Sequence, residues 1–83
     1  MRHARDEDLD RIEPLLVQIR AAAGGALKEK KRGCFYLKSK GFLHFHEDPK
    51  GMFADIGEDR IQVDDAAGAA EVLARVAALA ART

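Results

Sequence analysis

Two histidines stand two residues apart in the segment FLHFHEDPKG, which runs from Phe42 to Gly51. On a β-strand this spacing places both imidazoles on one face of the sheet, because successive side chains point to opposite faces. His44 and His46 could then bind one Zn²⁺ ion, whose nitrogen ligands lie about 2.0–2.1 Å away. We expect the third ligand to be Cys34 or, in another strand register, Asp55. The alternative, which we favour, is a structural role for both rings on a half-exposed sheet face, with no cofactor.

Catalysis has weaker support in the sequence. Cys34 close to His46 would resemble a nucleophile and its general base. Neither a third group that orients the base nor an oxyanion hole can be identified, and a lone cysteine in a strand is usually a small apolar residue. We therefore expect a binding function and no enzymatic activity.

A cluster of basic residues precedes the histidines. It consists of Lys28, Lys30, Lys31, Arg32, Lys38 and Lys40. With the aromatic side chains of Tyr36 and Phe42, it could bind single-stranded nucleic acid through phosphate contacts and base stacking. However, 14 basic and 14 acidic residues leave a formal net charge of zero. Nucleic acid is therefore a less favoured partner than protein.

The predicted strands also present an apolar face that the helices leave uncovered. Its members are Cys34, Tyr36, Phe42, His44, His46, Met52, Ala54 and Ile56, of which Tyr36, Phe42, His44 and His46 are the predicted contact residues. This is more apolar surface than solvent normally meets, and aromatic residues and methionine are enriched in the cores of protein interfaces. We predict a small interaction domain that forms a homodimer, or binds another protein, through this face.

Two helices and a short meander of strands must position these residues. Apolar residues at helical spacing predict a helix from about Asp10 to Ala23, with Pro14 tolerated in its first turn. Strands follow over RGCFYLK, FLHFHED and MFADI, with RIQV as a candidate fourth, and a last helix begins after Asp64-Asp65. We predict one α+β domain over residues 1–83, an antiparallel three- to four-stranded meander with an N-terminal and a C-terminal helix packed on one face.

The register of the hairpins decides which side chains the helices cover. DPKG and KSKG both suit type I turns closed by a bulged glycine, which places His46 opposite Ala54 and Cys34. The covered face then carries Phe35, Leu37, Leu43, Phe45 and Phe53. With two-residue turns it carries Leu43, Phe45, Met52, Ala54 and Ile56, and His44 faces Asp55 on the open side. We prefer the bulged register; in both, the two histidines lie together.

The expected compartment is the cytoplasm. The single cysteine excludes an internal disulfide and favours a reducing environment. The N-terminal segment MRHARDEDLDRIEP is too acidic and polar for a signal or transit peptide, and no apolar run approaches the roughly 20 residues of a membrane span. We expect no contact with membranes.

The stretch FYLKSKGFLHFHEDPKGMFADI resembles the central segment of a group of short uncharacterised bacterial proteins. It covers Phe35–Ile56, about a quarter of the chain, and its FLHFHEDP string is distinctive. The layout is also loosely similar to that of small α+β proteins of the YjbR type, which are described as DNA-binding. No motif of theirs is matched residue by residue, so the resemblance implies no particular activity.

Overall fold

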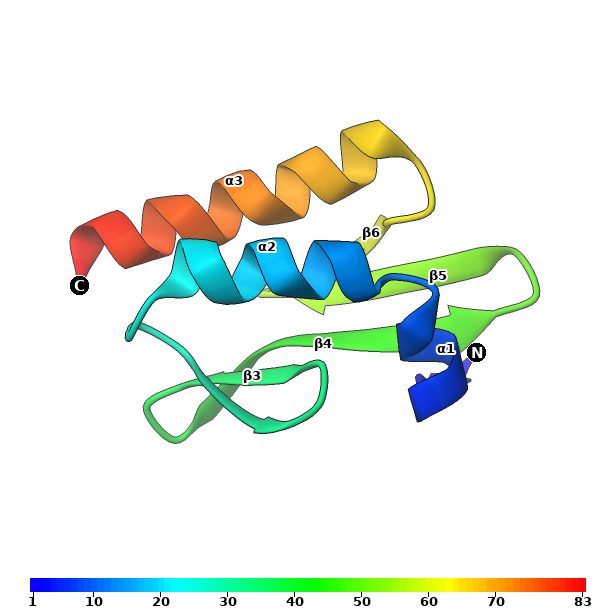
Figure 1. The fold of residues 1–83 in the computed structure, drawn as a ribbon, viewed down its shortest axis with the longest axis horizontal. Helices are drawn as coiled ribbons and strands as arrows, with labels where there is room; N and C mark the ends of the chain where they lie inside the picture. Colours follow the sequence, from blue (N-terminus) through cyan, green and yellow to red (C-terminus); the bar gives the residue numbers. More distant parts are fainter.

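Three helices and six strands follow one another over residues 1–83 in the computed structural model (Figure 1). In chain order they are β1 Arg2–His3, α1 Asp6–Asp10, α2 Glu13–Ala23, β2 Lys28–Lys31, β3 Cys34–Leu37, β4 Lys40–Asp48, β5 Gly51–Ile56, β6 Asp59–Gln62 and α3 Ala66–Arg82. All strand pairs are antiparallel. The predicted α+β class is confirmed, and the sheet has more strands than the predicted meander.

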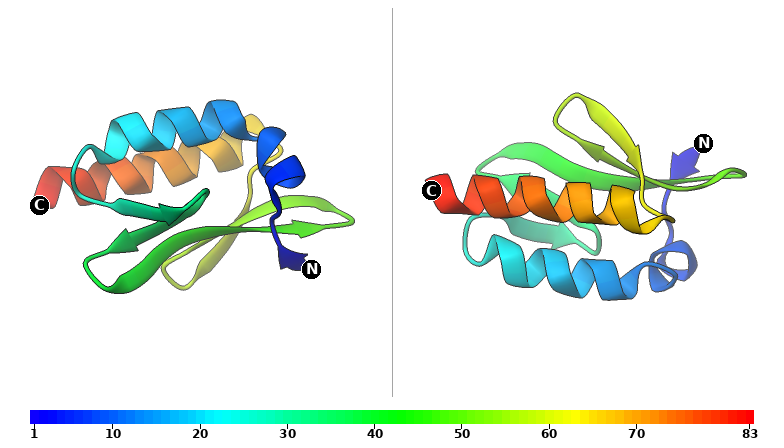
Figure 2. Two further views of the ribbon diagram at one scale, coloured as in Figure 1. Left: turned by 60° about the horizontal axis from the view of Figure 1, so that its bottom comes forward. Right: turned by 90° about the horizontal axis from the view of Figure 1, so that it is seen from above.

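The two long helices form a single layer on one face of the sheet (Figures 1 and 2). They lie side by side and run in the same direction. The apolar core fills the space between this layer and the sheet. Its fully buried members include Leu16, Ile19, Val72 and Val76 from the helices and Leu43, Met52, Ala54 and Ile56 from the sheet. None of the helices combines the length and apolar character needed to cross a bilayer.

The predicted N-terminal helix is divided in two. The chain leaves helical geometry at Ile12 (φ −118°, ψ 20°), which separates α1 from α2. Pro14 lies in the first turn of α2, where its missing N–H leaves no hydrogen bond unmade. The predicted apolar stripe is confirmed across this break, because Leu9, Ile12 and Leu15 are all buried.

Helix α3 begins where the sequence predicts, because Asp65 caps it. The Asp65 carboxylate accepts a hydrogen bond from the backbone N–H of Gly68 at 2.6 Å. Gly68 itself is required by a close approach, since a Cβ at this position would overlap the backbone carbonyl of Gln62. The glycine therefore allows α3 to start directly against the end of β6.

Strand β4 is the centre of the sheet. The order of strands is β2-β3-β4-β5-β6, and β1 also pairs with β4. β3 pairs with the first half of β4, through Phe35 opposite Leu43, and β1 pairs with the second half, through His3 opposite His46. Because β5 occupies the other edge of β4, β1 and β3 share the same edge.

The register of the β4–β5 hairpin differs from the preferred prediction. Asp48 pairs with Gly51 across a two-residue turn, so His46 lies opposite Phe53 and His44 opposite Asp55. The prediction that His46 lies opposite Ala54 is therefore wrong. Met52, Ala54 and Ile56 are buried under the helices, as in the alternative register, and Phe53 is only half-buried on the other face.

Two contacts beyond the turn explain this register. The backbone N–H of Met52 donates to the Asp64 carboxylate at 2.7 Å, which anchors the start of β5 to the segment before α3. The other register would turn the Asp55 carboxylate toward the helices, and burying a charge without a partner is costly. The observed pairing buries three apolar side chains and leaves Asp55 next to Arg60.

The β3–β4 pairing also differs from the prediction. Tyr36 pairs with Gly41 and Phe35 with Leu43, so Phe42 is the extra residue of a β-bulge. Phe42 packs against the core and lines a hollow with Ile56 and Leu79 instead of lying beside the histidines. On this edge of β4 the residue opposite His46 is His3, whereas the sequence predicted Cys34. Leu37, predicted in the core, is half-buried.

A network of arginines and glutamates joins α2 to the β2–β3 hairpin. Arg20 donates to Glu29 from Nε at 2.7 Å and from Nη2 at 3.0 Å, and to Glu13 at 3.0 Å. Glu29 also accepts from the backbone N–H of Gly33 at 2.9 Å. The hydrogen bonds from Arg20 are the main cause that lowers the pKa of Glu29, so its ionised form stabilises the fold.

We predict that Glu29→Gln lowers the free energy of unfolding at neutral pH by about 1 kcal/mol. This figure lies between the usual contribution of an exposed ion pair and that of a hydrogen bond to a charged group, because Glu29 is only partly buried. Because folding lowers the pKa of Glu29, its contribution is present above the ordinary value of 4.5 and is lost as the pH falls below it. Urea unfolding across this range should therefore show a shallower acid dependence in the variant. The exposed Glu7→Gln serves as the control, and parallel acid profiles for Glu29→Gln and wild type would contradict the assignment.

We predict that Met52→Ala destabilises the protein by about 2–5 kcal/mol, the usual cost of truncating a fully buried large side chain. Met52 has no exposed surface, whereas its neighbour Phe53 is half-buried on the open face. Phe53→Ala should cost clearly less in the same chemical denaturation experiment. The reverse order of the two costs would favour the bulged register.

Candidate metal site

All three histidines of the chain gather on the sheet face that the helices leave open. The imidazole centroids of His3 and His46 are 4.6 Å apart, those of His44 and His46 are 5.1 Å apart, and those of His3 and His44 are 5.8 Å apart. His44 and His46 share this face because they are two apart on β4. His3 joins them because β1 pairs with the same strand.

Asp55 is the acid that faces the two histidines of β4. Its Oδ2 lies 3.3 Å from Nε2 of His44 and 3.0 Å from Nδ1 of His46. The ligand atoms of all three residues lie within 4.8 Å of one another. In a tetrahedral zinc site with ligands about 2.0–2.1 Å from the ion, neighbouring ligand atoms are about 3.3 Å apart. The arrangement is therefore close to that of three ligands around one ion.

Arg60 from β6 holds the Asp55 carboxylate from the opposite side. Its Nε donates to Oδ1 at 2.6 Å and its Nη2 donates to Oδ2 at 2.9 Å, a bidentate pair. This pairing is the main cause that lowers the pKa of Asp55, which is therefore a carboxylate at neutral pH. The guanidinium fixes the orientation of the carboxylate and also competes for its Oδ2.

His46 carries a buried nitrogen that no hydrogen bond satisfies. Its side chain is 13% exposed, and Nδ1 makes no hydrogen bond although Asp55 Oδ2 is 3.0 Å away. Burial is the main cause that lowers the pKa of His46. The Asp55 carboxylate acts in the opposite direction, and the neighbouring His3 and His44 lower the pKa further. His46 is thus a neutral imidazole at neutral pH, with a nitrogen directed at a carboxylate.

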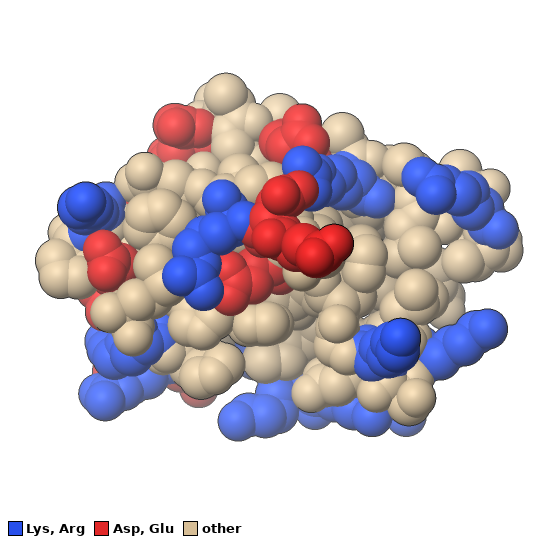
Figure 3. All heavy atoms as spheres, turned by 180° about the vertical axis from the view of Figure 1, so that it is seen from behind, with Lys and Arg blue, Asp and Glu red and all other residues tan.

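A solvent-open hollow leads to the cluster beside the β5–β6 turn. It measures about 320 Å³ and is lined by His44, Asp55, Gly57, Glu58, Asp59 and Arg60. In the view from behind, acidic side chains gather near the middle of the molecular surface, and basic side chains lie around them (Figure 3). The side chain of His44 is 39% exposed, so the cluster is accessible to ions from solvent.

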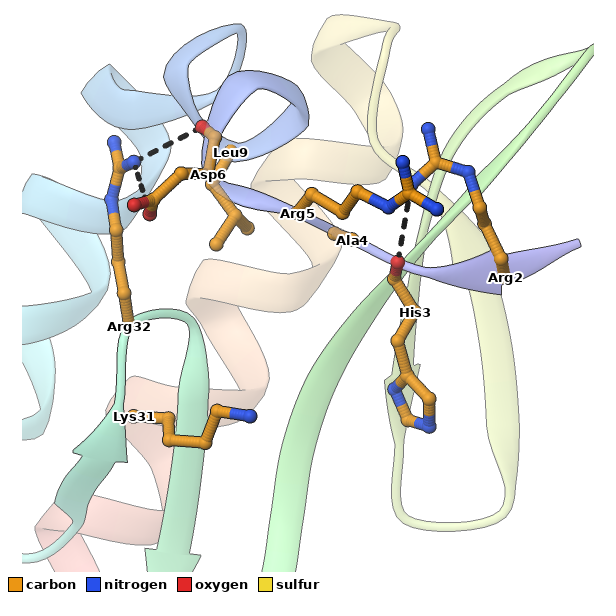
Figure 4. A pocket seen from close by; sticks show the side chains of 8 residues that line it. All are labelled: Arg2, His3, Ala4, Arg5, Asp6, Leu9, Lys31 and Arg32. Carbon is orange, nitrogen blue, oxygen red and sulfur yellow. Dashed lines mark hydrogen bonds and ion pairs between the residues drawn. The ribbon is translucent and has the colours of Figure 1, made fainter.

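A second depression lies on the other side of His3, between β1 and the β2–β3 turn (Figure 4). It measures about 680 Å³, and its lining includes Arg5, Lys31 and Arg32. Figure 4 shows the His3 imidazole pointing away from α1 and apart from the arginine side chains. The depression therefore borders the histidine cluster, and His3 is the residue that the two have in common.

The other predicted site residues lie apart from the cluster. Cys34 is half-buried in β3 and lines a pocket of about 260 Å³ with Tyr36 and His3, and it does not belong to the three-residue ligand group. Tyr36 is covered by Lys30, whose Nζ lies 4.5 Å from the ring centroid. Of the predicted binding face, the structure thus brings together His44 and His46 and separates them from Phe42.

The basic residues predicted to bind nucleic acid lie on β2, directly after it and at the β3–β4 turn. Lys28, Lys30 and Lys31 lie on β2, an edge strand, Lys38 lies in the β3–β4 turn, and Lys40 is the first residue of β4. Arg32 is already engaged by three acids, with N–O distances of 3.0 Å to Asp6, 2.9 Å to Asp10 and 2.8 Å to Glu13. The lysines instead make the exposed sheet edge polar, which discourages pairing with other chains.

The open face is less apolar than the sequence predicted. Met52 and Ile56, two of the apolar residues expected there, are in the core, and the half-buried Asp55 and the exposed Arg60 lie on the open face instead. Homodimerisation through this face remains a prediction. The observed register supports it less than the predicted register did, because fewer apolar side chains lie on the face.

Sequence reasoning missed two residues of the site. His3 was not connected to the other histidines, because a two-residue strand leaves no periodic signal. Arg60 was placed on a strand without a partner, although its position opposite Asp55 follows once the β5–β6 turn is known.

Comparison of the chain with protein-family models, curated proteins and solved structures found no match.

Proposed function

We propose that this protein binds a divalent transition-metal ion of the Zn²⁺ class through His44, His46 and Asp55. The observation that carries the proposal is the convergence of their ligand atoms within 4.8 Å of one another. Imidazole nitrogens and a carboxylate oxygen are ligands that zinc and its neighbours in the first transition series accept. The two-residue β4–β5 turn supports Asp55 as the third ligand, the alternative that the sequence left open.

The protonation states of His46 and Asp55 favour an ion. Metal ligation requires a neutral imidazole and an ionised carboxylate. Burial lowers the pKa of His46, and Arg60 lowers the pKa of Asp55, so both residues are in the required form at neutral pH. Little proton release would therefore accompany binding by these two groups.

The unsatisfied nitrogen of His46 is the second support. A buried polar atom without a partner costs about 1–3 kcal/mol. A cation between Nδ1 of His46 and Oδ2 of Asp55, which lie 3.0 Å apart, would give this nitrogen a partner. The same ion could be reached by Nε2 of His44.

We predict that Zn²⁺ stabilises the wild-type protein and fails to stabilise the double variant His44→Ala/His46→Ala. At a free-ion concentration 100 times Kd, ligation should add about 2.7 kcal/mol to the free energy of unfolding. Calorimetric titration should give one ion per chain, and NMR of the imidazole nitrogens should show coordination through Nε2 of His44 and Nδ1 of His46.

The control for this experiment is Glu58→Gln. Glu58 lines the same hollow but is not one of the three ligands, so its loss should change the zinc affinity only slightly. Equal weakening by Glu58→Gln and by the double variant would indicate diffuse attraction to acidic charge. No binding to the wild-type protein would refute the proposed function.

We predict that Arg60→Gln raises the zinc affinity several-fold. The substitution removes a positive charge next to the site and frees Oδ2 of Asp55 from its bond with Nη2. Arg75→Gln is the matched control, because Arg75 pairs with Asp59 and Glu71 and not with Asp55. A lower affinity in Arg60→Gln would show that orientation of the carboxylate outweighs the competition.

A further inference from the structure

We propose that His3 is a fourth ligand of this ion, so that metal binding ties strand β1 to strand β4. The inference rests on the proposed function and adds a consequence to it. His44, His46 and Asp55 supply three ligands, one fewer than a closed zinc site uses. The fourth would come from β1, a strand of only two residues.

The position of His3 follows from strand pairing. His3 is the direct cross-strand partner of His46, and directly opposed side chains in an antiparallel pair lie on the same face with Cβ atoms about 4.5–5.5 Å apart. The two rings are tilted by 33°, with centroids 4.6 Å apart, and the His44 ring is 5.8 Å from that of His3. His3 does not belong to the group of ligand atoms that lie within 4.8 Å of one another, so its ring has to reorient to bring a nitrogen to the ion.

His3 is free to make that rotation. Its side chain is exposed, and its imidazole nitrogens make no hydrogen bond or ion pair in the structure. The ring projects from β1 on the side away from α1 (Figure 4). The only polar contact at His3 is at its backbone carbonyl, which accepts from Arg2 at 3.5 Å. Reorientation of the ring therefore breaks no bond.

Strand β1 is held by its pairing with β4 and by a small number of polar contacts, among them an ion pair of the Met1 amino group with Asp48 at 3.5 Å. It is two residues long, and its docking is continued by one hydrogen bond, from the N–H of Ala4 to the carbonyl of Phe45 at 3.1 Å. Arg2 adds ion pairs to Asp8 at 2.9 Å and to Glu47 at 3.2 Å.

A pocket of about 260 Å³ lies along the other side of β1. It is lined by His3 and Ala4 from the N-terminal segment and by Gly33 and Cys34 from the β2–β3 hairpin. On that side no strand pairs with β1, whose one partner in the sheet is β4. A two-residue strand with one paired edge opens easily, and a metal bond through His3 would oppose that opening.

Amide hydrogen exchange of Ala4, measured with and without saturating Zn²⁺, tests the inference. In the wild-type protein Zn²⁺ should slow exchange of the Ala4 amide several-fold. In His3→Ala the ion should bind about tenfold more weakly or worse, since even groups that only support a ligand usually change metal affinity by that much. Exchange at Ala4 in this variant should not respond to Zn²⁺.

Two further variants make the result specific. His3→Cys supplies a different zinc ligand and should restore both the affinity and the response of Ala4. Glu7→Gln alters an exposed residue of the same segment and should behave like the wild type. Equal zinc affinity and an equal Ala4 response in His3→Ala and wild type would overturn the role of His3 alone. Absence of zinc binding in the wild type would overturn the proposed function itself.

Discussion

The pairing of β4 with β5 is the constraint on which the rest of the structure depends. Side chains alternate between the two faces of a strand, so one choice of register assigns every residue of the hairpin to the core or to the open face. The observed choice sends Met52, Ala54 and Ile56 under the helices and leaves Asp55 opposite His44. The core and the candidate metal site are therefore two results of the same pairing.

Asp55 connects the electrostatics of the site to the fold. In the structure its charge is balanced by Arg60, which stands on the next strand, and the imidazoles of His44 and His46 approach from the other side. A cation and Arg60 would compete for Oδ2 of Asp55, while Arg60 could keep its hydrogen bond to Oδ1. Such competition lets the open face remain folded without an ion, because the carboxylate keeps a charged partner in either state.

Much of the fold was predictable from local sequence patterns. The apolar stripes of the two long helices, the cap at Asp65 and the strand segments of β3 to β6 follow from periodicity and turn residues. Strand β2 was missed because KEKK has no apolar alternation, and β1 because two residues cannot show a period. Both strands exist through their pairing with a neighbour, which a local pattern does not record.

The sequence by itself determined the α+β class and the fact that His44 and His46 share an open face, because both follow from spacing along the chain. Only the tertiary structure decided which acid and which third histidine accompany them. The DPKG turn allows two registers, and the choice is made by burial of side chains in a shared core and by Asp64, which is 12 residues from the amide it binds. Interactions between segments distant in the sequence therefore determine the site's membership, since turn chemistry acts over only four residues.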